Sequence, residues 1–273
     1  CMAAHGKQLL LLLSVVLAAA AAAPKSSQSQ WYLNAVREWP GFKATHGKHY
    51  PDRTEELRRK TYYLTTAIAI KKNNDAFLKR KSSFLMAHNN FSDWDRTEYS
   101  RLNGFLGRKL QMSNGFLANA SRFLRPLNAE IPDSVDWRDH GLVTEVKVQG
   151  QCGSCYAFAS TGALEGQHMR ATGEMVELSE QNIVDCSRAY GNAGCEGGLM
   201  NHVFDYIKDN KGIDTEDGYP YDAREEECQF SRSDIGADDK GYVWTKSGDE
   251  EELKAAVATV GPISVAIDAS HIS

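Results

Sequence analysis

Only one hydrophobic run in the sequence is long enough to be considered as a membrane span. The run, LLLLLSVVLAAAAAA at positions 9–23, is shorter than the roughly 20 apolar residues that cross a bilayer, and it ends in small residues. Because Met2 and Lys7 precede it, residues 1–23 are typical of a secretory signal peptide that is cleaved near Ala23. We therefore expect no membrane span after signal removal.

Basic residues are scarce in the second half of the chain. Residues 131–273 carry 11 Lys and Arg against 27 Asp and Glu, whereas residues 24–130 carry 19 against 9, so their net charges are −16 and +10. A basic segment can indicate nucleic-acid binding, but the opposite charges favour the simpler interpretation that the two segments attract each other. We therefore expect no nucleic-acid partner, and the length of 273 residues favours two folded units.

Cysteine is limited to six residues, and the sequence has only one C-x-x-C pair, formed by Cys152 and Cys155. A four-cysteine zinc site requires a second matching pair, so we expect no metal, and no motif indicates a cofactor. Cys152, Cys186, Cys195 and Cys228 allow three disulfide pairings, and a secreted chain favours such bonds. A thioredoxin-like thiol oxidoreductase stays open as an alternative, because a predicted strand precedes the C-x-x-C pair and a helix follows it.

The stretch QGQCGSCYAFA, positions 149–159, combines a thiol with a predicted helix start. Cys155 lies at the beginning of a helix that we expect to extend to about Thr172. A helix N-terminus favours an anion, and the thiolate formed from a thiol of intrinsic pKa ~8.5 is the nucleophile. We therefore predict that Cys155 is a catalytic nucleophile, with Gln149 six residues upstream.

The segment Cys152–Tyr156 reads CGSCY and matches the pattern C-G-[SA]-C-[WY] of papain and the cathepsins. The chain therefore resembles the papain family of cysteine proteases, specifically a cathepsin L-like precursor. This resemblance implies an α+β, papain-like fold: a helical domain with Cys155, a β-rich domain and a helical inhibitory propeptide. It also implies that the Gln149 side chain and the Cys155 backbone N–H stabilise the oxyanion. Val148 and Tyr156 replace a common Asn and Trp, which we expect to alter packing only.

Two helices are predicted before residue 81. The first covers 30–39 and ends at Pro40, and the residues on one face are Trp31, Ala35 and Trp39. The second begins after Asp52, in capping-box spacing to Glu55, and extends to about Arg80. The residues expected on its inward face are Leu57, Leu64 and Ile68.

The second helix has the spacing of the ERFNIN pattern of cathepsin L-type propeptides, with Tyr and Thr substituted at two positions: Glu55, Arg59, Tyr63, Thr66, Ile70 and Asn74. The GNFD pattern of these propeptides follows, with Ala in place of Gly: Ala87, Asn89, Phe91 and Asp93. The two motifs together favour a propeptide over an unrelated helical domain. We assign residues 24–130 to an inhibitory propeptide and residues 131–273 to a peptidase domain that is incomplete at its C-terminus.

The peptidase segment is expected to contain further helices after Ser179, near Gly198 and from Asp249 to Gly261, and strands at 143–148 and 263–267. The resemblance implies the disulfides Cys152–Cys195 and Cys186–Cys228. It also implies a substrate-binding wall with an apolar pocket for the residue second from the scissile bond, formed by Gly197, Gly198, Leu199, Met200 and Ala266. Core packing is the alternative role for these residues.

The proton acceptor of such a site is not evident in the sequence. In the papain family the catalytic His and Asn lie ~130–150 residues after the nucleophile, whereas 118 residues follow Cys155. His168, His202 and His271 are at unsuitable positions by helix geometry or by resemblance. We therefore expect the catalytic His and Asn to lie beyond Ser273 and the 273-residue fragment to be inactive.

The expected function is a cysteine endopeptidase zymogen that acts on peptides or proteins, with its own propeptide as intramolecular inhibitor, in a lysosomal or extracellular location. Asn90 and Asn119 lie in N-x-S/T sequons and are candidate glycosylation sites. A propeptide-type inhibitor of other cysteine proteases is the alternative, beside the less favoured oxidoreductase.

Overall fold

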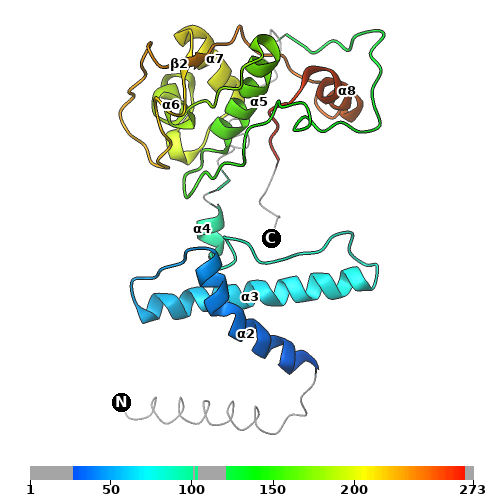
Figure 1. The fold of residues 1–273 in the computed structure, drawn as a ribbon, viewed down its shortest axis with the longest axis vertical. Helices are drawn as coiled ribbons and strands as arrows, with labels where there is room; N and C mark the ends of the chain where they lie inside the picture. The colour runs from blue at the N-terminus through cyan, green and yellow to red at the C-terminus, as the bar shows by residue number, and fades with distance from the viewer. Residues whose placement is uncertain (1–26, 101, 104–120, 268–273) are drawn as a thin grey trace. The chain divides into compact units, whose positions relative to one another are not determined.

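The computed structural model describes residues 27–100, 102–103 and 121–267, so the predicted signal peptide lies outside the described residues. The chain divides into two compact units, Cys1–Asp95 and Arg96–Ser273. The elements are α2 (Ser27–Thr45), α3 (Arg53–Leu78), α4 (Arg96–Ser100), α5 (Cys155–Thr172), α6 (Glu180–Cys186), η1 (Ser187–Tyr190), η2 (Gly194–Glu196), α7 (Met200–Asn210), β1 (Ile213–Asp214), β2 (Ile235–Ala237) and α8 (Glu250–Val260) (Figure 1). None of the described helices combines the length and apolar character needed to cross a membrane.

Helix α2 is longer than predicted, because it continues through Pro40 to Thr45. The prediction that Pro40 ends the helix is therefore wrong. A proline inside a helix removes one backbone hydrogen bond at a cost of about 3 kcal/mol, and the axis of α2 bends part-way along its length (Figure 1). Burial of Trp39 and Phe42 on either side of the proline offsets this cost, since both side chains are less than 10 % exposed.

Helix α3 begins where the capping signal predicts. The Asp52 carboxylate accepts hydrogen bonds from the backbone N–H groups of Thr54 and Glu55. The predicted inward face is wrong in part, because Leu57 and Ile68 are 56 % and 52 % exposed. Tyr63 and Ala67 are the buried residues instead, because α3 packs against α2 along a narrow strip that the aromatic side chains of α2 define.

The propeptide-motif residues of α3 bind the main chain that returns along the helix. The contacts are Arg59 Nη1 to Asp93 O at 3.3 Å, Thr66 Oγ1 to Ser92 O at 3.0 Å, and a reciprocal pair between the Asn74 side chain and the Met86 backbone at 2.8 Å. Glu55 binds Arg59 at 2.6 Å and so orients the guanidinium. Ile70 and Phe91 are half-buried, and the exposed Asn89 accepts from the Phe91 N–H. The spacing of the first motif thus allows its polar side chains to form hydrogen bonds with the backbone of the segment that follows α3.

Asp93 is the buried charge of this unit. Its carboxylate is 2 % exposed, accepts a hydrogen bond from the Tyr50 hydroxyl at 2.7 Å, and lies 3.1 Å from Lys48 Nζ. Burial, followed by the hydrogen bond and charge of Asp93, raises the pKa of Tyr50. The last residue of the second motif therefore fixes the loop between α2 and α3.

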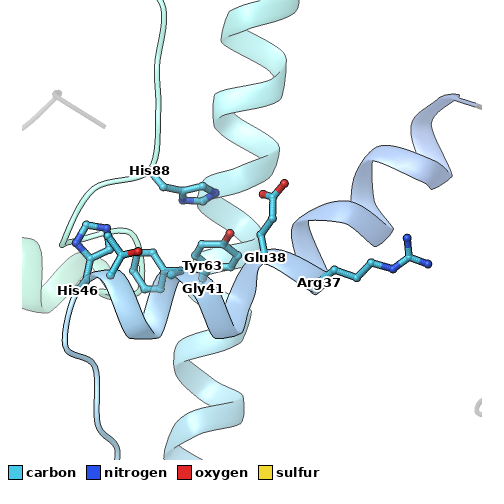
Figure 2. Close-up of a pocket in the computed structure, with 8 residues that line it drawn as sticks. Arg37, Glu38, Gly41, His46, Tyr63 and His88 are labelled. Carbon is cyan, nitrogen blue, oxygen red and sulfur yellow. The ribbon is translucent and has the colours of Figure 1, made fainter.

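A shallow depression of about 370 Å³ lies between α2 and the segment after α3. Figure 2 shows the His88 ring above Tyr63, and the two rings stack with their centroids 4.2 Å apart. Burial lowers the pKa of His88. Glu38 also lines the depression, whereas the Arg37 guanidinium points away from it (Figure 2).

The second unit has a helical core. Figure 1 shows α5 between α6 and α8. The large side chains buried among α5, α6, α7 and the adjoining loops are Tyr156, Leu178, Ile183, Val203, Ile207 and Ile213. Strands β1 and β2 form an antiparallel pair in which Ile213 lies opposite Ala237. The fold class is α+β, as the sequence predicts.

Both strands predicted for the peptidase segment are wrong. Residues 143–148 and 263–267 form neither a helix nor a strand in the described structure. Val146 is 95 % exposed and Ile267 is 67 % exposed. Alternation of apolar and polar residues predicts an extended backbone with two faces, whereas a strand also requires a neighbouring strand to bind its N–H and C=O groups.

Candidate active site

Cys155 is the first residue of α5, where the sequence places it. It is half-buried and stands outside both disulfides. Ser154 is the N-cap residue, but its side chain makes no capping hydrogen bond to the helix. The thiol is therefore located at the positive end of the helix dipole, which stabilises a thiolate.

The disulfide Cys152–Cys195 holds the loop that leads to the thiol. The Gly153 N–H also donates to the Cys195 carbonyl at 2.8 Å, so the loop is fixed by a covalent and a hydrogen bond. Cys186 pairs with Cys228, and both pairs are those implied by the resemblance. Because Cys152 is bonded to Cys195 and not to Cys155, this C-x-x-C pair is not a redox disulfide of the thioredoxin type.

Gln149 directs its side-chain amide back to the same loop. Its Nε2 atom donates to the Cys152 carbonyl at 2.8 Å and lies 3.4 Å from the Leu102 carbonyl. Leu102 belongs to the predicted propeptide, so one main-chain carbonyl from that segment lies at the amide. The amide is thus positioned in a loop that ends at Cys155 and is able to donate to a carbonyl oxygen.

Gly198, one of the two glycines of the expected substrate-binding wall, packs against Tyr156 of α5. An added Cβ at Gly198 would lie 2.5 Å from Asn192 Oδ1 and 2.6 Å from Tyr156 Cδ2, so the packing excludes any side chain there. Gly197 has φ of 114°, in the region that favours glycine. The Leu199 N–H donates to Asn192 Oδ1 at 2.9 Å, and its side chain is buried. Gly198 therefore has a packing role beside Tyr156, the neighbour of the thiol.

Met200 and Ala266, the other wall residues, are less buried. Met200 is half-buried at the start of α7, and Ala266 is exposed in the segment after α8. This segment is held against α5, because the Ser264 hydroxyl donates to the Ala159 carbonyl at 2.6 Å. Gly198 and the segment that contains Ala266 thus both lie against α5, the helix that begins at Cys155.

A buried charge cluster that the sequence does not reveal links α5 to α6. Lys147 Nζ lies 2.8 Å from Glu165 on α5 and 2.9 Å from Glu180 on α6, and both carboxylates are 1 % exposed. Burial alone would lower the Lys147 pKa, but the charges of Glu180 and Glu165 raise it. Burial raises the pKa of Glu180. The only sequence signal is a lysine within the apolar, alternating stretch 142–148.

The histidines of the second unit have other positions. His168 lies 13 residues after Cys155 on α5, or about 20 Å along the helix axis. His202 packs on Gly191, where an added Cβ would lie 2.9 Å from its ring, and burial lowers its pKa. The His140 ring packs on Trp137 at 5.2 Å. His271 lies outside the described residues.

No three His, Cys, Asp or Glu side chains in residues 27–100 and 121–267 are arranged to hold a metal ion. Of the two sequons, Asn90 is exposed and Asn119 lies outside the described residues.

Comparisons with known proteins agree with this architecture. Residues 131–273 match the model of the papain family cysteine proteases, and residues 39–99 match the cathepsin propeptide inhibitor domain. A cathepsin L-like protein of Caenorhabditis elegans is 50 % identical over 240 residues, which are 88 % of this chain and 70 % of the relative. Human cathepsin L2 is 44 % identical over 241 residues, covering 88 % of this chain and 70 % of the relative.

Among solved structures, digestive procathepsin L 3 of Tenebrio molitor larval midgut is similar with a TM-score of 0.72 and 38 % identity. The match covers 83 % of this chain and 71 % of that structure. The thiol at the start of α5, the preceding propeptide unit and these matches lead to one conclusion. The chain belongs to the papain family of cysteine proteases, as a cathepsin L-like zymogen.

Proposed function

We propose that this zymogen yields an endopeptidase in which Cys155 is the nucleophile and Gln149 is an oxyanion donor. The thiolate attacks the substrate carbonyl carbon, and the negative oxygen accepts from the Gln149 amide and the Cys155 N–H. Loss of the protonated amine leaves a thioester, which water hydrolyses. The observation that supports this proposal most is the position of Cys155 at the start of α5, in a loop to which the Gln149 amide is bound.

The proton acceptor is proposed to be a histidine, oriented by an asparagine, outside residues 27–267. This proposal rests on the positions of His168 and His202, which are respectively remote from the thiol along α5 and packed on Gly191. A protein that ends at Ser273 is accordingly expected to show no peptide hydrolysis. Sequencing of the transcript past the Ser273 codon tests this: a His codon ~20–30 residues on, followed by an Asn codon, is the expected result, and a stop codon directly after Ser273 would contradict it.

The substrate preference is proposed to be apolar at the second residue before the cut. The backbone of Gly197 and Gly198 would bind an extended peptide, and Leu199, Met200 and Ala266 would supply apolar contacts. Profiling the processed enzyme with a peptide library is expected to give at least tenfold higher kcat/KM for Leu or Phe than for Asp or Lys at this position. A preference for charged residues there would refute the assignment.

The propeptide, residues 24–130, is proposed to inhibit the peptidase through charge complementarity as well as packing. One contact between the segments is explicit: Arg122 Nη2 lies 2.8 Å from Glu252 on α8. The main chain of residues 121–123 also pairs with Trp244 through hydrogen bonds of 2.8 and 3.0 Å. The hydrogen bond from Arg122 lowers the Glu252 pKa, so this pair persists to a lower pH than an ordinary Glu would allow.

Acidification is expected to release the propeptide. Carboxylates that attract the basic propeptide are ionised above their folded-state pKa values, and the attraction is lost as the pH falls through those values. We expect the affinity of the isolated propeptide for the processed enzyme to fall at least tenfold between pH 7 and pH 4, with a smaller pH dependence for Glu252→Gln. An affinity that does not change over this range would refute the charge mechanism.

Cleavage between the propeptide and the enzyme is proposed to occur near residue 130. The enzyme is proposed to be located in the lysosome or outside the cell. Use of the Asn90 sequon is consistent with the exposure of its side chain.

Inhibition of related proteases by the propeptide alone is a second candidate function, which the match of residues 39–99 to an inhibitor domain favours. Nanomolar inhibition by residues 24–130 would support it.

A further inference from the structure

The hydroxyl group of Tyr221 lies between the two ends of the loop that precedes the catalytic helix. It is 2.8 Å from the Gln149 carbonyl and 2.6 Å from Ser154 Oγ. A carbonyl only accepts, so the single phenolic proton is donated to Gln149 O. Ser154 Oγ must then donate its proton to the Tyr221 oxygen. The result is a two-step relay of hydrogen bonds from the N-cap of α5 to the backbone of Gln149.

The Tyr221 side chain is itself firmly held. Its ring packs edge-on against Phe158 of α5 with centroids 4.9 Å apart. Its backbone N–H donates to Glu216 Oε1 at 2.9 Å. Burial raises the pKa of Tyr221 to about 12, so the phenol keeps the proton that the relay requires at any working pH. The hydroxyl is thus a fixed point against which the loop is located.

Among the residues that the structure describes, Tyr221 is the side chain that hydrogen-bonds to both Gln149 and Ser154. The disulfide Cys152–Cys195 and the Gly153 N–H bond hold its middle, and Gln149 Nε2 binds only as far as Cys152 within the loop. The backbone of Gln149 determines where the amide begins, and Ser154 determines where the N–H of Cys155 points. One hydroxyl therefore contacts both residues that set the separation of the two oxyanion donors.

We propose that Tyr221 is a positioning residue of the oxyanion site, an inference that rests on the function proposed for Gln149 and Cys155. Tyr221 does not contact the substrate. It fixes the Gln149 backbone relative to the start of α5, so that the side-chain amide and the helix N–H converge on one oxygen atom. Such donors lose much of their effect when they are misplaced, because stabilisation of an oxyanion depends on preorganised geometry.

The test is a double-mutant cycle in the processed enzyme. Tyr221→Phe removes only the hydroxyl and keeps the ring contact with Phe158. We expect it to lower kcat about tenfold with little change in KM. Gln149→Ala is expected to lower kcat by about 10²–10³-fold. In the Gln149→Ala background, the further effect of Tyr221→Phe should be less than twofold, because the donor that Tyr221 positions is gone.

Tyr219→Phe is the matched control. Tyr219 is buried two residues away in the sequence, and its hydroxyl donates to Asp185 of α6 at 2.7 Å. Its loss is expected to lower the melting temperature and leave kcat within twofold. If Tyr221→Phe does not fold, Ser154→Ala breaks the same relay and is expected to show the same non-additivity with Gln149→Ala.

Three outcomes overturn the inference: normal kcat in Tyr221→Phe, equal losses of kcat in Tyr221→Phe and Tyr219→Phe, or an effect of Tyr221→Phe that multiplies in full with that of Gln149→Ala. Failure of the proposed function gives a different result, because Gln149→Ala alone would then retain normal kcat.

Discussion

Replacement of Cys155 with alanine is expected to abolish peptide hydrolysis by the processed enzyme, with kcat reduced on the order of 10⁵-fold or more. The sulfur atom of the thiolate forms the thioester. No other described thiol can replace it, because the four other described cysteines form disulfides. The zymogen variant should also fail to remove its own propeptide. Assay of the purified variant with a fluorogenic peptide measures the loss.

The control for this substitution is a measurement of the stability and propeptide binding of the variant. Cys155 is half-buried and outside the disulfides, so Cys155→Ala should leave the melting temperature within a few degrees and retain binding of the propeptide. Activity above about 1 % of the parent, after contaminating protease has been excluded with an active-site titrant, would contradict the assignment of the nucleophile.

Replacement of Lys147 with methionine is expected to destabilise the peptidase unit by about 3–5 kcal/mol at pH 7, because it leaves two buried carboxylates without their cation. Glu165 and Glu180 are 1 % exposed and also bind Thr144, Thr161 and the Leu178 N–H. Urea unfolding monitored by tryptophan fluorescence gives the difference. Lys254→Met, at an exposed position on α8, is the matched control and should change stability by less than about 0.5 kcal/mol.

The pH dependence of this variant has a definite sign. Burial raises the pKa of Glu180 even with Lys147 present, and loss of the cation raises it further. A carboxyl group with a raised pKa in the folded state makes folding more favourable as the pH falls toward its unfolded value near 4.3. The deficit of Lys147→Met should therefore be smaller at pH 5 than at pH 7. A deficit that grows on acidification would contradict the buried-pair account.

The helices were the part of the fold that sequence patterns predicted best. Asp52, Ser179 and Asp249 each cap the helix that follows them, because a capping side chain acts on the backbone two or three residues away. The helix boundary at Pro40 was wrong because tertiary burial of Trp39 and Phe42 outweighed a local signal. Strands at 143–148 and 263–267 were wrong because pairing is non-local and alternation does not report it.

The site shows the same division between local and non-local information. The position of Cys155 at a helix start follows from neighbouring residues, and the disulfide pairs followed only from resemblance. The Lys147 cluster and the Tyr221 relay join residues 18 to 72 positions apart. No spacing rule connects such residues, so only the folded structure reveals them.

The measurement that tests the central claim most directly is mass spectrometry of the processed enzyme, quenched in acid within milliseconds of mixing with a peptide ester. The account predicts a mass increase equal to the acyl part of the substrate, located on Cys155 by fragmentation and removed by hydroxylamine, as expected for a thioester. An active enzyme with no such adduct under burst conditions, or with the acyl group on another residue, would contradict covalent catalysis by Cys155.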